Sequence, residues 1–80
     1  MEVGRVVFSK CGRDKGRVFL VLSVEDEYVF LTDGQLRPLN KPKKKKIKHT
    51  QPTHHIMGAA TTGGLTTDAD IRKWLLKYNE

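Results

Sequence analysis

The feature that most constrains this chain is a basic loop, bracketed by glycines, between two short apolar segments. The loop Gly12-Arg13-Asp14-Lys15-Gly16-Arg17 lies between Val6-Val7-Phe8 and Val18-Phe19-Leu20-Val21-Leu22. Both flanks are rich in β-branched and aromatic residues, which favour strands, and the glycines permit a reversal of the chain between them. The sequence therefore predicts a strand-loop-strand unit at its start.

The loop carries more charge than a simple turn needs. Its cations Arg13, Lys15 and Arg17 surround a single acid, Asp14. Basic side chains and the backbone amides that glycine exposes can meet a phosphate together. A solvated hairpin tip without a ligand is the alternative, and the loop alone leaves both interpretations open.

Length, charge and cysteine content narrow the class of protein. The 80 residues suffice for one domain with a thin core, and the net charge of +6 predicts a polyanionic partner, more often nucleic acid than an anionic membrane. No apolar run has the roughly 18 to 20 residues of a membrane span, and the first residues lack a signal pattern. Because Cys11 is the one cysteine, no internal disulfide is possible, and we expect a cytoplasmic protein. We also expect it to be monomeric when free.

Further strands follow the first two. We expect strands at residues 3–8, 17–23, 28–32 and 35–39, with a tight hairpin at Asp33-Gly34 whose central positions both need positive φ, and a weaker strand at 46–49. In the second strand, Val18, Leu20 and Leu22 would share one face, and Phe19 and Val21 the other. Short strands joined by short turns are typical of a small all-β barrel.

The composition changes sharply after the fourth predicted strand. From Arg37 to Lys48 the chain is strongly basic and contains no acid. Lysines carry charge without a fixed geometry, so we expect them to anchor phosphates rather than to read sequence. A solvated patch without a ligand is the alternative. Ile47 is the one aliphatic residue among the lysines, and we expect it to point inward.

The end of the chain predicts a connector and a helix. Residues 51–64 are polar and small and contain Pro52 and Gly63-Gly64, which is typical of a surface connector. Thr67 is a good N-cap for a helix of about three turns. Its apolar residues recur at helical spacing: Ile71, Trp74, Leu75 and Tyr78. We expect this stripe to pack on the barrel; a docking surface for a protein, anchored by Trp74, is the alternative.

These motifs resemble a known family. Gly4-Arg5-Val6-Val7, the glycine-bracketed basic loop and the strand after it are similar to the KOW motif of ribosomal proteins and transcription elongation factors. Asp33-Gly34, Arg37, the lysine run and Ile47-Lys48-His49 resemble one branch, the fourteenth large-subunit ribosomal protein of archaea and eukaryotes and its compact bacterial relatives. The resemblance covers residues 3–52.

The resemblance implies a mainly β fold with a small SH3-like barrel of the KOW type at residues 1–52. The patterns of the tail add a connector at 53–66 and a short C-terminal α-helix at 67–79, packed on the barrel in a single domain. The resemblance also implies RNA binding, with ribosomal RNA as the partner. With the cations of the loop and the lysine run, the candidate RNA-binding residues are Lys10, Arg13, Lys15, Arg17, Arg37, Lys41, Lys43, Lys44, Lys45, Lys46, Lys48 and His49. The structural turn residues are Gly12, Gly16 and Gly34.

Catalysis is not favoured by the residues. The loop from Gly12 to Gly16 lacks the Gly-Lys-Ser/Thr ending and the following helix of a nucleotide-binding loop. Asp14 lies among cations, which lowers the pKa of a carboxyl and disfavours a role as general base. We therefore expect no enzymatic activity and no cofactor.

A metal site is equally disfavoured. His49, His54 and His55 with Cys11 have poor spacing for zinc, and there is no Cys-x-x-Cys pair. We expect His49 to donate to phosphate and the other two histidines to be plain loop residues. Tyr28 is a candidate for stacking on a base, although its alternation with Phe30 favours a half-buried position in the strand.

The sequence thus predicts a protein that binds structured RNA or associates with the ribosome through the basic loop and the lysine-rich edge. The rival is a module for docking ribosomal or transcription proteins through the C-terminal helix.

Overall fold

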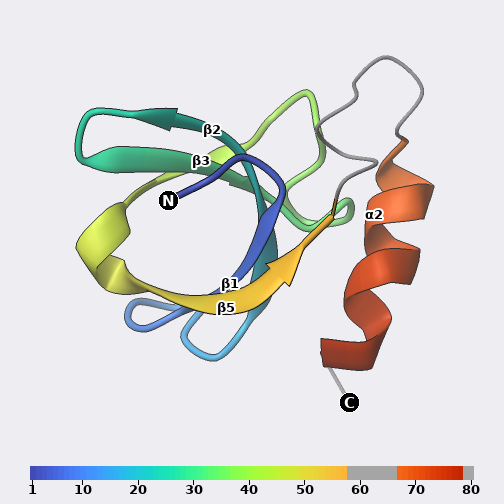
Figure 1. Cartoon of the computed structure of the whole chain (residues 1–80). Coiled ribbons are helices and arrows are strands. Elements are labelled where there is room, and N and C mark those ends of the chain that lie inside the picture. Colours follow the sequence, from blue (N-terminus) through green and yellow to red (C-terminus); the bar gives the residue numbers. More distant parts are fainter. Residues whose placement is uncertain (58–66, 79–80) are drawn as a thin grey trace.

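The computed structural model describes residues 1–57 and 67–78 and shows one antiparallel sheet with a helix beside it (Figure 1). The strands follow the order β4-β3-β2-β1-β5 in the sheet. The elements along the chain are β1 (Arg5–Ser9), β2 (Val18–Glu25), β3 (Tyr28–Thr32), β4 (Lys43–Lys46), the 3-10 helix η1 (Ile47–His49), β5 (Thr50–Ile56), α2 (Asp68–Leu75) and the 3-10 helix η2 (Leu76–Tyr78). The mainly β class with a short C-terminal helix is confirmed, and the curled sheet is consistent with an SH3-like barrel.

Strand β2 holds the fold together because it is apolar on both faces. Val18 and Leu20 belong to one buried cluster, and Phe19 and Val21 belong to a second. Successive side chains of a strand point to opposite faces, so the predicted division of these residues is confirmed. Leu22 is only half-buried, at the point where the pairing of β2 with β3 shifts register.

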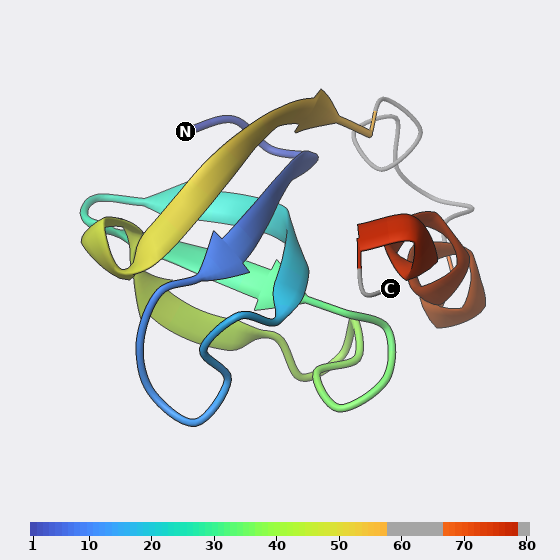
Figure 2. The same ribbon diagram turned by 90° about the horizontal axis from the view of Figure 1, so that it is seen from below.

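The two buried clusters lie on opposite sides of the sheet. The interior of the barrel is filled by Val7, Phe19, Val21, Val29 and Leu31, with Ile47 packed against them. The outer cluster combines strand residues with the helix and consists of Val6, Val18, Leu20, Ile71 and Leu75. Helix α2 therefore covers the outer face of β1 and β2, and Figure 2 shows it beside the barrel.

Helix α2 begins where the sequence predicts. The side chain of Thr67 accepts a hydrogen bond from the Asp70 amide (3.2 Å), and the Asp70 carboxylate accepts one from the Thr67 amide (3.1 Å). This reciprocal capping box satisfies donors that a helix start otherwise leaves unpaired. Ile71 and Leu75 are 0% and 1% exposed. The apolar stripe is thus used for packing on the sheet.

The predicted fourth strand at residues 35–39 is wrong, and so is the hairpin at Asp33-Gly34. Residues 33–40 form a loop in which Asp33 Oδ1 accepts hydrogen bonds from the amides of Gln35 and Arg37 (2.9 Å each). Aspartate often gives the backbone such an alternative to a sheet ladder. Of the two residues expected to have positive φ, only Gly34 does, at 75°.

Helix α2 holds this loop in place. Asp68 Oδ1 accepts a hydrogen bond from the Leu39 amide (2.8 Å), and Arg72 donates one to the carbonyl of Gly34 (2.6 Å). A Cβ atom on Gly34 would overlap with the carbonyl oxygen of Asp68. Gly34 therefore permits both the turn and the close approach of the helix.

The lysine run itself supplies the fourth strand of the chain, which the sequence did not predict. Lys43–Lys46 pairs with β3 as β4, and the strand expected at 46–49 is instead the short 3-10 helix η1. The next strand, β5, pairs with β1 and lies at the edge of the sheet that the described residues form, a position that tolerates Pro52. β5 extends to Ile56, beyond residue 52, where the barrel was expected to end. Of the connector predicted at 53–66, residues 58–66 lie outside the described residues.

The contact between Gly34 and the helix gives a test of the packing. Gly34→Ala should lower the free energy of unfolding by about 3 kcal/mol, because it adds a steric clash to the cost of a positive φ. Gly16→Ala is the matched control, since Gly16 has φ of 87° but no atom within 4 Å of the position that a Cβ would take. The free energy of unfolding of Gly16→Ala should fall by only about 1 kcal/mol, because this variant has the positive φ without the steric clash. Urea denaturation measures both; equal losses would contradict the close approach of the helix to Gly34.

Candidate nucleic-acid interface

A buried carboxylate lies at the centre of the predicted basic loop. Asp14 Oδ1 accepts hydrogen bonds from Ser9 Oγ (2.7 Å) and Lys45 Nζ (2.9 Å). Its second oxygen, Oδ2, forms an ion pair with Lys43 Nζ at 2.7 Å. Lys45 Nζ also donates to the carbonyl of Cys11 (3.0 Å). Asp14 therefore fastens the loop to strand β4, which follows about thirty residues later in the chain.

The surroundings of Asp14 keep it ionised. Burial alone would raise the pKa of this carboxyl, but hydrogen bonds from Lys43, Ser9 and Lys45 outweigh that effect and hold the pKa well below its ordinary value. The predicted direction of the pKa shift is confirmed. The charge of Asp14 is thus permanent near neutral pH and offsets the two lysines beside it.

The four lysines of β4 divide into two pairs because side chains alternate along a strand. Lys43 and Lys45 lie opposite Leu31 and Val29, whose side chains fill the barrel interior. Lys45 is only 8% exposed. The expectation that Lys45 lies at an RNA-binding surface is therefore at odds with its position, since its ammonium group is buried against Asp14.

The other pair faces outward. Lys44 and Lys46 lie opposite Phe30 and Tyr28, and the Lys44 ammonium lies 4.5 Å from the centre of the Tyr28 ring. A cation over an aromatic face is favourable in itself. Tyr28 is half-buried, as the alternation in its strand suggests. The outward side of β3 and β4 thus combines two rings with two lysines.

Backbone hydrogen bonds fix the shape of the loop. The Lys10 amide donates to the carbonyl of His49 (2.8 Å), and the amides of Gly16 and Arg17 donate to the carbonyls of Ser9 and Asp14 (2.9 Å each). Gly12 and Gly16 both have φ of 87°, a region that favours glycine. Both glycines thus have a backbone conformation that suits a turn, and the loop is tied to both β4 and η1.

The fold gathers most of the predicted RNA-binding residues around this loop and β4. The exposed ones are Lys10, Arg13, Lys15, Arg17, Arg37, Lys41, Lys44 and Lys48. Lys43, Lys46 and His49 are half-buried, and Lys45 is buried.

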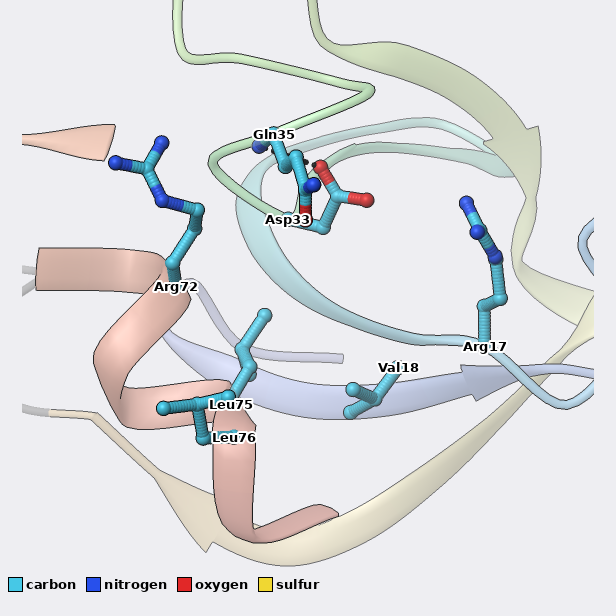
Figure 3. Close-up of a pocket in the computed structure, with 7 residues that line it drawn as sticks. All are labelled: Arg17, Val18, Asp33, Gln35, Arg72, Leu75 and Leu76. Carbon is cyan, nitrogen blue, oxygen red and sulfur yellow. Dashed lines mark hydrogen bonds between the residues drawn. The ribbon is translucent and has the colours of Figure 1, made fainter. Parts of the chain in front are cut away.

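Two adjoining clefts lie next to the loop and share Arg17. The loop-side cleft, of about 450 Å³, is lined by Arg13, Asp14, Arg17, Phe19, Leu36, Arg37 and Lys43. The helix-side cleft, of about 470 Å³, is lined by Arg17, Val18, Asp33, Gln35, Arg72, Leu75 and Leu76 (Figure 3). Sequence reasoning did not single out Asp33 or Arg72 as site residues, because the loop and helix that bring them together are distant in the chain.

Comparison with known proteins shows a similarity to a ribosomal protein. The chain is similar to the large ribosomal subunit protein eL14 of Methanococcus vannielii. The two are 34% identical over 53 residues, which cover 66% of this chain and 64% of the archaeal protein. The match thus spans just under two thirds of eL14. No protein-family model matches the chain.

The similarity to eL14 agrees with the branch that the sequence motifs resemble, although the KOW motif is not itself matched by a family model.

The remaining candidate residues lie apart from the basic loop. His54 is exposed on β5, and the ring of His55 contacts Tyr78 edge-on, with 5.4 Å between centroids. Within residues 1–57 and 67–78, no group of three or more potential metal ligands comes together.

The ion pairs of Asp14 predict a pH-dependent stability. Because folding lowers the pKa of Asp14, the folded state binds fewer protons than the unfolded state. The stabilisation that the ionised Asp14 carboxylate provides is therefore fully present above the unfolded-state pKa of about 3.9. It should be lost progressively as the pH falls below about 4. Asp14→Asn should remove this dependence and, near neutral pH, lower the free energy of unfolding by about 3 kcal/mol, since Lys45 stays buried without its partner.

The control for this prediction is Asp26→Asn in the exposed turn between β2 and β3. Asp26 has φ of 54°, which asparagine tolerates, so its loss should change stability by less than about 0.5 kcal/mol. Urea denaturation between acidic and neutral pH measures both variants. A wild-type protein whose stability is the same on both sides of pH 4 would contradict the assigned role of Asp14.

Proposed function

We propose that this protein binds structured RNA, with ribosomal RNA as its target, through the basic loop and the outward lysines of β4. The observation that carries this proposal is the attachment of the loop to β4 through Asp14. Because the attachment is rigid, the loop arginines and the strand lysines form one fixed array of cations. A fixed array of cations loses less conformational entropy when it binds a phosphate backbone than flexible side chains would, because it is already ordered.

The charge of the array is suited to RNA. Arg13, Lys15 and Arg17 are exposed on the loop, and Asp14, the acid among them, is already neutralised by two lysines. The exposed acids Glu25, Asp26 and Glu27 directly precede Tyr28, which pairs with Lys46, so they lie at the end of β4 away from Lys43. The basic loop itself carries no unpaired acid, and its exposed cations can attract polyanions at long range.

The similarity to eL14 supports the choice of RNA. That relative is by its name a protein of the large ribosomal subunit, so we infer a ribosome-associated, non-catalytic role in the cytoplasm for this chain. Phosphate contacts would set the position on the RNA, while arginines and stacked rings would supply any preference between sequences.

The rival interpretation, a module that docks proteins through its helix, is less well supported. Ile71 and Leu75 are buried against the sheet, and Trp74 packs against the same cluster. The apolar stripe of α2 is thus largely occupied within the molecule. Leu76 remains exposed, but one exposed leucine is ordinary for a small protein.

The alternation of the lysines gives a sharp test of this function. Lys44→Gln combined with Lys46→Gln should weaken binding to ribosomal RNA fragments and reduce the slope of log affinity against log salt by about 1.5, if each lysine neutralises one phosphate. Filter binding over a salt series from about 50 to 200 mM measures this slope. Folding should be unaffected, since both side chains point outward.

Lys45→Gln is the control, because it removes one positive charge from the same strand but from a buried position. It should lower thermal stability while leaving the salt slope of the folded protein unchanged. If the variant with both Lys44→Gln and Lys46→Gln binds RNA with wild-type affinity and salt slope, β4 is not part of the interface. If the wild-type protein shows no salt-dependent RNA binding at all, the proposed function is wrong.

A further inference from the structure

The two clefts that share Arg17 differ in charge, although they adjoin. The loop-side cleft holds four cations, Arg13, Arg17, Arg37 and Lys43, and its one acid, Asp14, is already paired with lysines. The helix-side cleft is lined by one carboxylate, Asp33, by Gln35 and by three apolar residues, Val18, Leu75 and Leu76. Its two cations are Arg17, which both clefts share, and Arg72, which donates to the carbonyl of Gly34. One cleft suits a phosphate and the other suits a group that is flat, partly apolar and rich in hydrogen-bond donors.

We propose that the two clefts together hold one unpaired guanosine nucleotide of the bound RNA, with its phosphate in the loop-side cleft and its base in the helix-side cleft. Arg17 would lie between base and phosphate. This inference rests on the proposed function and names the feature of the RNA that the protein recognises.

The loop-side cleft is suited to phosphate by geometry as well as charge. Guanidinium groups present several donors in a plane and bind phosphate oxygens two at a time. Three arginines of this cleft come from two loops that are both held by hydrogen bonds, the 10–17 loop and the 33–40 loop. Lys43 adds a further cation and is itself positioned by Asp14.

The helix-side cleft suits a phosphate less well than the loop-side cleft does, because the Asp33 carboxylate offsets the charge of Arg17 and Arg72. Asp33 Oδ1 is fixed by the amides of Gln35 and Arg37. Figure 3 shows the other oxygen turned toward Arg17, with Val18 beside Arg17 and the two leucines on the helix. Val18 and Leu75 are almost fully buried and Leu76 is 62% exposed, so a base would lie mainly on Leu76 and direct its edge toward the Asp33 carboxylate.

Guanine is the base whose edge fits a carboxylate. Its N1–H and its exocyclic amino group are adjacent donors, whereas adenine and cytosine place a ring acceptor beside their amino group. In a duplex these donors are paired, so the nucleotide must come from a loop, a bulge or an end. Arg72 and Gly34 hold the 33–40 loop on the helix, so the cleft is formed before RNA arrives.

Short single-stranded RNAs test this inference. The probes are oligouridines with one central guanosine, inosine or adenosine, and the same strand with uridine throughout, measured by fluorescence anisotropy. The wild-type protein should bind the guanosine strand at least about fivefold more tightly than the adenosine strand, which is the lower limit for a two-point contact to a base edge. Inosine, which lacks the amino group, should lie between them.

Asp33→Asn should abolish this preference without weakening the binding of the all-uridine strand. Asparagine keeps the oxygen that accepts the two loop amides, so the loop should stay folded. Arg37→Gln is a second variant, directed at the phosphate: it should weaken the binding of every strand by a similar factor and leave the preference for guanosine intact. Thermal melting of both variants checks that they fold.

The outcomes separate this inference from the proposed function. The wild-type protein could bind the guanosine and adenosine strands equally well while the Lys44→Gln, Lys46→Gln variant still shows the reduced salt slope. That result would overturn the nucleotide site but leave the proposed function intact. A preference that persists in Asp33→Asn would also overturn the nucleotide site. Guanosine monophosphate should compete only weakly, because it lacks the flanking phosphates; competition as effective as that of the RNA strand would assign the clefts to a free nucleotide instead.

Discussion

The interaction on which the rest of the structure depends is the ion pairing of Asp14 with Lys43 and Lys45. It joins a loop near the start of the chain to a strand near its middle, and it lies at one end of the barrel interior. An uncompensated lysine at the position of Lys45 would be costly, because charges lose much of their hydration on burial. The same carboxylate that stabilises the fold therefore also sets the arrangement of the cations around it.

A second constraint comes from β2, which is buried on both faces. The inner face closes the barrel, and the outer face needs a cover, which helix α2 provides. The helix then holds the 33–40 loop through Asp68 and Arg72. Packing and the candidate site are thus linked: the helix that covers the sheet also forms one wall of the helix-side cleft.

The predictions from sequence succeeded where a local pattern was decisive. The two-faced β2, the turn glycines of the basic loop and the Thr67 cap all follow from short-range rules of alternation, positive φ and capping. They failed at residues 33–40, where Asp33 satisfies the backbone that a strand would have used. They also missed the strand within the lysine run, because such a run has weak strand propensity and only its pairing with β3 makes it β4.

The sequence by itself determined the class of the fold, the helix and the net positive charge, because each of these depends on composition or on spacing along the chain. Only the tertiary structure decided which lysines are available. Four identical neighbours in the sequence become two outward cations and two that face Asp14, because strand pleating and the position of a distant carboxylate assign them different surroundings. The two clefts are likewise a tertiary feature, since their walls come from three segments that meet only in the folded chain.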